Sequence, residues 1–182
     1  PPPEDAEASA PPLQQGETVP TFVTRLARAK AEAVSKLLPP SETRAILACD
    51  TVGEIGGVIF GKPTDAHDAR RMIETLSGKK HRVFTGVSIW FPEPAERIKA
   101  NTSLGQYRVK EGCAISEVFM ELLQKKEVDD YLATNDWHGK AGACGFQDGH
   151  LPLRLITGSV DTVVGLPVEF IEQLVIKHLR SR

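Results

Sequence analysis

The chain has 182 residues, of which 41% are hydrophobic and 25% are charged, and its formal net charge at pH 7 is −2. These values are ordinary for one soluble globular domain, and they give no electrostatic basis for a general nucleic-acid-binding or membrane-surface protein. No apolar run approaches the roughly 20 residues that a membrane span needs, so we expect neither nucleic acid nor membrane as a partner.

The chain contains three widely separated cysteines, Cys49, Cys113 and Cys144. An odd number of scattered cysteines does not suit a disulfide framework and fits buried or free thiols in a reducing compartment. We therefore expect a cytoplasmic protein.

The first 20 residues differ from the rest of the chain. They are rich in proline and acidic residues, contain neither lysine nor arginine, and carry almost no large apolar side chain. Such a segment cannot bury enough surface to offset the entropy lost on ordering it. We predict an acidic, proline-rich loop or tail over residues 1–20 and a single domain over residues 21–182.

From residue 20 onward, the pattern of apolar residues predicts alternating helices and strands. The predicted helices cover about 20–38, 65–77, 124–134 and a segment that begins at Pro167. The predicted strands cover AILACD, a hairpin through GEIGGVIF, HRVFTGVSIW, about 107–121, and LRLITGS. Helices interleaved with strands and hairpins indicate a mixed sheet and an α/β or α+β fold.

The first predicted helix carries a lysine where an apolar residue is expected. At 100° per residue, the apolar side chains fill one broad face, and Lys30 lies near its centre. A lysine there is costly unless a negative group meets it. Either its stem packs while the ammonium reaches water, or it points into a cleft that binds an anion.

The predicted strand AILAC leads into Asp50 and Thr51. Ligands of open α/β sheets bind beyond the carboxyl ends of strands, so a carboxylate at this place is a candidate metal ligand or general base. The alternative is a strand-end aspartate that bonds the amides of a turn.

The segment GGVIFGKP nearly spells a phosphate-binding loop. The motif needs serine or threonine after the lysine, but Pro63 stands there, and VIF between the glycines indicates a strand. We reject the loop but keep Lys62 as a candidate phosphate ligand, because Pro63 and Thr64 are expected to open a helix whose amino end favours anions. An ordinary exposed turn lysine is the alternative.

The segment WHGKAGACGFQDG concentrates glycines around Lys140 and Gln147. Glycines let a backbone approach a ligand closely, and a glutamine amide offers a donor and an acceptor to the edge of a nucleobase. A plain loop or a bulged strand edge is the alternative. No histidine or cysteine grouping has zinc-ligand spacing, and no G-x-S-x-G nucleophile motif is present.

Together, five segments resemble the Maf family of nucleotide pyrophosphatases, which are relatives of the inosine-triphosphate pyrophosphatases. These segments, in the family's order, are LARAKAEAV, ACDTVGEIGGVIFGKP, DARRMIETLSGKKHRVFTGV, EVDDYLATNDWHGKAGACGFQDG and GSVDTVVGLPVEFIEQL. The resemblance implies an elongated mixed sheet flanked by helices, with two lobes and a central cleft.

The resemblance implies a hydrolase that cleaves a nucleoside triphosphate between its α and β phosphates, giving the monophosphate and pyrophosphate. A divalent metal cation (Mg²⁺, Mn²⁺ or Co²⁺) is the implied cofactor. By motif position, Asp50 matches the family's catalytic aspartate and is the implied metal ligand. Lys30 and Lys62 match its phosphate-facing lysines, and we expect Lys140 in the GKAG block to contact substrate as well. Lysines offset charge on a departing pyrophosphate, and a carboxylate orients metal or water.

The resemblance also concerns the choice of nucleobase. Thr51 and Gln147 match positions that the family links to base selectivity. Gln147 resembles the branch that acts on dTTP and UTP, whereas the sister branch that acts on 7-methyl-GTP tends to carry an acidic residue there. Whether the protein forms a homodimer is left open.

The chain departs from the family pattern at its amino end. Family members open with a strand and an S-x-x-R loop that contacts phosphates, and no segment here matches it. We expect either a truncated chain or a protein that lacks part of its phosphate site, and a family acidic residue corresponds to Glu4 or Asp5. Two classes therefore stay open: an enzyme that removes non-standard or surplus pyrimidine nucleotides, and a non-catalytic nucleotide-binding or septum-related interaction protein.

Overall fold

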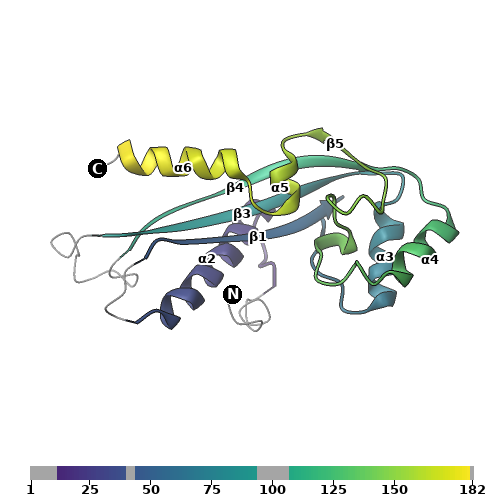
Figure 1. Cartoon of the computed structure of the whole chain (residues 1–182), viewed down its shortest axis with the longest axis horizontal. Helices are drawn as coiled ribbons and strands as arrows, with labels where there is room; N and C mark the ends of the chain where they lie inside the picture. Colours follow the sequence, from purple (N-terminus) through teal and green to yellow (C-terminus); the bar gives the residue numbers. More distant parts are fainter. Residues whose placement is uncertain (1–11, 40–43, 94–106, 181–182) are drawn as a thin grey trace. The chain divides into compact units, whose positions relative to one another are not determined.

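The computed structural model describes residues 12–39, 44–93 and 107–180 (Figure 1). Its helices are α2 (Val19–Leu37), α3 (Ala66–Leu76), α4 (Lys125–Ala133), α5 (Val160–Val164) and α6 (Val168–Arg180), with a 3-10 turn, η2 (Ala141–Ala143). Its strands are β1 (Ile46–Ile55), β2 (Val58–Phe60), β3 (Lys80–Pro92), β4 (Tyr107–Met120) and β5 (Leu153–Thr157). None of the described helices is both long and apolar enough to cross a membrane.

The five strands form one sheet in the order β2-β1-β3-β4-β5. The alternation of helices and strands predicted from the sequence is confirmed. Where we expected a mixed sheet, the edge pairs β1–β2 and β4–β5 are both antiparallel. A short connection such as the turn between β1 and β2 can join only antiparallel neighbours, because parallel strands need a long crossover.

The strand that contains Asp50 is longer than predicted. We expected it to end at Asp50, but β1 continues to Ile55, so the aspartate lies in mid-strand. The β-branched residues Thr51 and Val52 favour this extension. The reversal comes at Gly56 and Gly57, whose φ angles of 57° and 86° suit a two-residue hairpin turn.

The described residues belong to two compact units. Unit 1 is drawn from Pro1–Asp50, Gly86–Cys113 and Glu169–Arg182, and unit 2 from Thr51–Thr85 and Ala114–Val168. The boundaries fall within β1, β3 and β4, so each of these strands contributes residues to both units. The single domain expected over residues 21–182 stays a prediction.

Unit 1 has helices on both faces of its part of the sheet. Ala31 of α2 packs with Ile46 and Trp90 on one face. Val87 and Ile89 of β3 pack with residues of α6. Because adjacent side chains of a strand point to opposite faces, Ile89 and Trp90 place α6 and α2 on opposite sides of β3.

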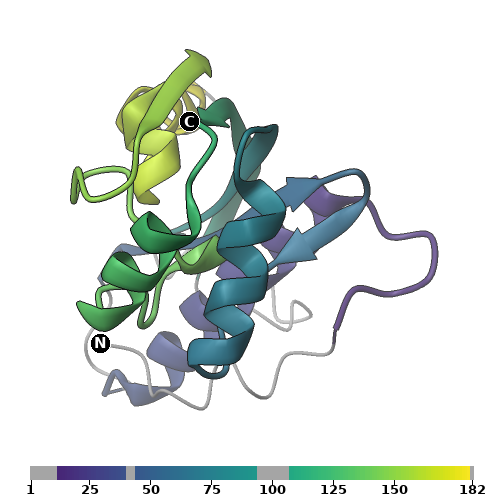
Figure 2. The same cartoon turned by 90° about the vertical axis from the view of Figure 1, so that its right-hand side faces the viewer.

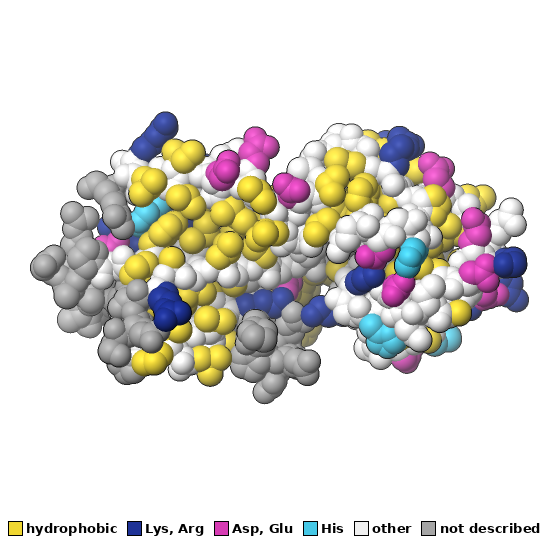
Figure 3. Space-filling view, viewed as in Figure 1, with side chains coloured by type: hydrophobic (Ala, Val, Ile, Leu, Met, Phe, Trp, Pro, Cys, Tyr) yellow, Lys and Arg dark blue, Asp and Glu magenta, His cyan; other side chains and the backbone are white. Residues whose placement is uncertain are grey.

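Helix α6 is apolar beyond its buried face. It buries Leu174 and His178, while Ile176 and Leu179 are 47% and 58% exposed. Figure 3 shows apolar side chains gathered over this helix. Within the described residues, no other element covers these exposed apolar side chains of α6. They do not contribute to the position of α2.

Helix α2 sits directly on a glycine of β3. A Cβ atom built on Gly86 would lie 2.3 Å from the carbonyl oxygen of Val23 and 2.6 Å from the amide nitrogen of Thr24. Both atoms belong to helix backbone, which cannot move aside as a side chain can. Gly86 is therefore required for the observed distance between α2 and the sheet.

The amino end of α2 is fixed by its cap and by the loop before it. The Thr18 hydroxyl accepts a hydrogen bond from the Thr21 amide, as expected of an N-cap. The Glu17 carboxylate accepts hydrogen bonds from the Arg25 guanidinium at 2.8 Å, and this partner lowers the pKa of Glu17 to about 2. Glu4 and Asp5, named above as candidates, lie outside the described residues.

Unit 2 has its own core, in which α3 and α4 lie side by side (Figure 2). Met72, Ile73 and Leu76 of α3 contact a cluster that includes Tyr131 of α4 and Trp137 just after it. Asp65 caps α3 by accepting a hydrogen bond from the Asp68 amide. The helix therefore begins at Ala66, three residues after the Pro63 at which we expected it to open.

We predict that Gly86→Ala lowers the free energy of unfolding by about 1–3 kcal/mol or more, because the added methyl group has no room against the α2 backbone. Gly61→Ala is the matched control, since a Cβ there meets no atom within 4 Å. Chemical denaturation of both variants measures the difference. Equal stability of the two variants would contradict the close-packing argument.

Candidate functional site

Lys30 and Asp50 form an ion pair within unit 1. The distance from Lys30 Nζ to Asp50 Oδ1 is 2.5 Å, and the two side chains are only 14% and 10% exposed. The negative group that a lysine on an apolar helix face requires is therefore a carboxylate of the neighbouring strand. A shielded pair of this kind is stable only while both partners are present, because removing one leaves an uncompensated charge.

The strand around Asp50 sends alternate side chains to its two faces. Cys49, one residue earlier, packs against the cluster formed with α6 rather than against α2. Burial raises the pKa of the Cys49 thiol to about 11, although nearby Lys30 opposes this shift. Burial thus disfavours the thiolate of Cys49, which is the nucleophilic form of a cysteine.

In unit 2, a backbone hydrogen bond joins the GKP loop to the GKAG segment. The amide of Gly142 donates to the carbonyl of Gly61 at 2.9 Å, and η2 packs on α3. Lys62 and Lys140 thus lie on neighbouring loops although 78 positions separate them in the sequence. Two candidate residues therefore belong to one region of unit 2: Lys62, from the rejected phosphate-loop motif, and Lys140, from the glycine-rich segment.

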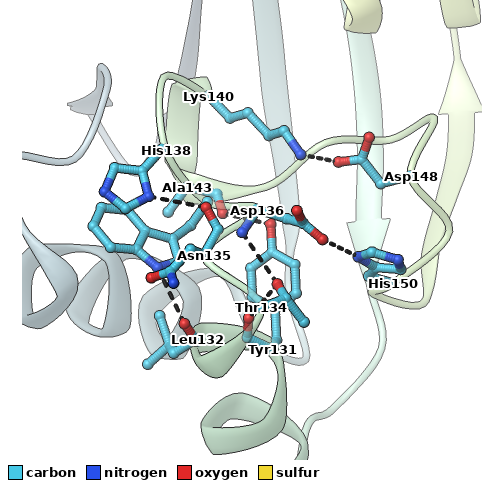
Figure 4. Close-up of polar contacts among 11 residues, drawn as sticks. Tyr131, Leu132, Thr134, Asn135, Asp136, His138, Lys140, Ala143, Asp148 and His150 are labelled. Atoms are coloured by element: carbon cyan, nitrogen blue, oxygen red, sulfur yellow. Dashed lines mark hydrogen bonds and ion pairs between the residues drawn. The ribbon is translucent and has the colours of Figure 1, made fainter.

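The glycine-rich segment is an ordered loop with several polar contacts (Figure 4). Lys140 forms an ion pair with Asp148, and the Asp136 carboxylate contacts His150 Nδ1 at 2.8 Å. A Cβ built on Gly145 would lie 2.1 Å from Asp148 Oδ2, so this glycine allows Asp148 to lie against the loop backbone. Like Lys30, Lys140 has a carboxylate as its partner.

The loop is attached to the core of unit 2 by a buried tyrosine. The Tyr131 hydroxyl donates to the carbonyl of Ala143 at 3.0 Å, and burial raises the pKa of that hydroxyl (Figure 4). Ala143 has a φ of 61°, which is unusual for alanine and needs support from its surroundings. The tyrosine therefore holds the GKAG segment in a conformation that it would not adopt alone.

The two residues matched to base selectivity lie in different surroundings within unit 2. Gln147 is exposed in the turn that precedes Gly149. Thr51 is half-buried, and its hydroxyl lies 2.9 Å from that of Thr85 on β3.

Sequence reasoning missed Thr85 and Asp148. Thr85 is fully buried in the strand segment VFTGV, and a polar residue inside an otherwise apolar strand was the available signal. Asp148 directly follows Gln147, but only the folded loop shows that its carboxylate reaches Lys140.

The structure brings together some of the predicted residues. Lys30 contacts Asp50 in unit 1, and the loops of Lys62 and Lys140 are joined in unit 2. We expect Lys30, Asp50 and Lys62 to converge on one cleft, and this remains a prediction, as do the roles assigned to each residue.

The residues present are compatible with a metal that is held largely by substrate. Within the described ranges, no group of three or more His, Cys, Asp or Glu side chains could hold a metal ion. Mg²⁺ is commonly bound through one or two carboxylates, with substrate phosphates and water as the other ligands. The single carboxylate of Asp50 fits that pattern.

Comparison with known proteins gives the family. The family model described as "Maf-like protein" matches residues 3–178, so the chain belongs to the Maf family. It is 38% identical over 154 residues to a "dTTP/UTP pyrophosphatase" of Anaeromyxobacter dehalogenans, covering 84% of this chain and 71% of the relative. Proteins with the same name from Aliivibrio fischeri (34% identity; 91% and 81% covered) and Geobacter sp. strain M21 (39%; 84% and 72%) are also similar.

We predict that Tyr131→Phe lowers the free energy of unfolding by about 0.5–1.5 kcal/mol, because the buried carbonyl of Ala143 loses its donor. Hydrogen exchange should become faster in residues 140–145 than in α2. Exchange that is unchanged in this segment would show that the hydroxyl does not hold the loop.

Proposed function

We propose that this protein is a nucleoside triphosphate pyrophosphatase that hydrolyses dTTP and UTP to the monophosphate and pyrophosphate. The observation that carries the proposal is the identity of 34–39%, over most of the chain, to relatives that bear this activity in their names. The shielded Lys30–Asp50 pair supports it, because a carboxylate and an ammonium are the groups that hydrolysis of a phosphoanhydride needs.

The proposed reaction divides the work between carboxylate and lysines. Asp50 orients the attacking water and accepts its proton. Lys30, Lys62 and Lys140 bind phosphate oxygens and offset the negative charge that grows on the departing pyrophosphate. A divalent cation, when bound by Asp50 and the phosphates, would supply further charge neutralisation.

Binding of phosphates requires the lysines to exchange partners. In the structure, Lys30 is paired with Asp50 and Lys140 with Asp148. As phosphate oxygens approach, each ammonium gains a more highly charged partner, and its carboxylate is released. For Asp50, this release provides the basic group at the moment when substrate is present.

Base selectivity is assigned to Gln147 and Thr51. The exposed Gln147 amide carries both a donor and an acceptor, so it can pair with the O4 or the N3–H edge of uracil or thymine. A carboxylate at this position could only accept, which suits the donor-rich edge of 7-methylguanine. We also place the protein in the cytoplasm, in keeping with cysteines that form no disulfide in the described part of the chain.

Replacing Asp50 with Asn should reduce kcat by about 100-fold or more, because the nearly isosteric amide can neither accept the proton nor bind a cation strongly. Pyrophosphate release from dTTP measures the effect, and thermal unfolding tests the fold. Glu32→Gln on α2 is the control, since that carboxylate pairs with Lys36 and both side chains are far more exposed. Near-normal turnover in a folded Asp50→Asn variant would contradict the assigned role.

Replacing Gln147 with Glu should erode the preference for dTTP and UTP over 7-methyl-GTP, because the carboxylate loses the donor for O4. Relative kcat/KM for the three nucleotides measures the change. Gln173→Glu, an exposed glutamine of α6, should leave the ratio unchanged. If Gln147 only supported its loop, all three activities would fall together.

A further inference from the structure

Three residues of unit 2 form a hydrogen-bonded chain that includes Thr51, one of the two predicted base-selectivity residues. The Thr51 and Thr85 hydroxyl oxygens are 2.9 Å apart. Thr85 Oγ1 lies 2.7 Å from the backbone carbonyl oxygen of Thr162 on α5. The chain therefore runs from β1 through β3 to α5.

The direction of each hydrogen bond follows from counting protons. A carbonyl oxygen can only accept, so the single hydroxyl proton of Thr85 is committed to Thr162. Between the two hydroxyls, Thr51 must then donate to Thr85. With its own proton committed, Thr51 can offer only lone pairs to a ligand.

The carbonyl that sets this direction is held firmly. Ser159 caps α5, accepting a hydrogen bond from the Thr162 amide at 3.2 Å, and Ser116 exchanges two 3.0 Å hydrogen bonds with the Ser159 backbone. Thr85 itself is fully buried, so no water can replace its partner. Within the described residues, the Thr51 hydroxyl at 2.9 Å is its other hydrogen-bond partner, and the 2.7 Å contact with the carbonyl is the shorter of the two.

The Thr51 hydroxyl also faces Gly165, the residue that ends α5. A Cβ atom built on Gly165 would lie 3.0 Å from Thr51 Oγ1, so a glycine is what allows α5 to end this close to the hydroxyl. Gly165 ends α5 with a φ of 100°, a conformation that favours glycine. Thr51 is half-buried, so part of the residue remains accessible to a ligand.

We propose that Thr85 is a positioning residue that makes Thr51 an obligate hydrogen-bond acceptor and thereby selects pyrimidines that carry N3–H. This inference rests on the proposed function, in which Thr51 contacts the base. N3–H is the only N–H on the uracil and thymine rings, whereas N3 of cytosine is a bare acceptor. A cytosine in the same pose would set its lone pair against that of Thr51 and leave both without a hydrogen bond.

The test compares UTP with CTP as substrates of the wild type and of three variants. In Thr85→Val, the Thr51 hydroxyl loses its acceptor and can turn to donate to N3 of cytosine, so the UTP-to-CTP ratio of kcat/KM should fall at least about tenfold. Thr85→Ser keeps a hydroxyl and should retain the wild-type ratio. Thr162→Val is the matched control, because it removes a hydroxyl from the same cluster but keeps the backbone carbonyl.

The outcomes separate this inference from the proposed function. A wild type that hydrolyses UTP without preference over CTP, or a ratio that is unchanged in Thr85→Val, overturns the role of Thr85 and leaves the pyrophosphatase activity standing. An equal fall in Thr162→Val also overturns it, since the effect would then follow from loss of any hydroxyl. If neither the wild type nor any variant hydrolyses nucleotide, the proposed function fails. The ratio of UTP to CTP affinities, measured by calorimetry for the wild type and the variants, then tests the role of Thr85.

Discussion

The close packing of α2 on β3 is the constraint on which the candidate catalytic pair depends. Because Gly86 has no side chain, the helix backbone rests on the strand, and Lys30 comes within 2.5 Å of Asp50 on the adjacent strand β1. A side chain of any size at this glycine would lift the helix away from the sheet. A lysine and an aspartate with so little exposure would then each lose the partner that makes burial of its charge tolerable.

The same rule governs the polar groups of unit 2, although there most of them are neutral. Lys140 is matched by Asp148, and the buried hydroxyls of Tyr131 and Thr85 each donate to a backbone carbonyl. Buried polar groups remain in a fold only when their hydrogen bonds are made, so these partners have little freedom to change. A ligand can consequently reach these groups only on the side that faces away from their protein partner. Whether each group donates or accepts there is already fixed by that partner.

Much of the fold followed from the sequence because local signals were strong. The helices predicted over about 20–38 and 65–77 lie close to the observed α2 and α3. The end of β1 did not follow, because its extension through Thr51 depends on pairing with β2 and β3, which no local pattern reveals. Lys30 was recognisable as an anomaly, but its direct ion pair with Asp50 was not, since that contact depends on how closely α2 approaches the sheet.

Neutral hydrogen-bond networks were the least predictable part. The sequence marks Thr51 through its position beside Asp50, yet the property that matters for a ligand is where its hydroxyl proton points. That direction is set by Thr85 and by the Thr162 carbonyl of α5, which are both far from Thr51 in the sequence. It can be worked out only once the distances between these three groups are known. Residue identity at a contact position therefore underdetermines specificity, because the same threonine could donate or accept. The hydrogen-bond partners of that threonine decide which, and under our proposal a substitution of Thr85 changes the accepted base without touching any group that contacts it.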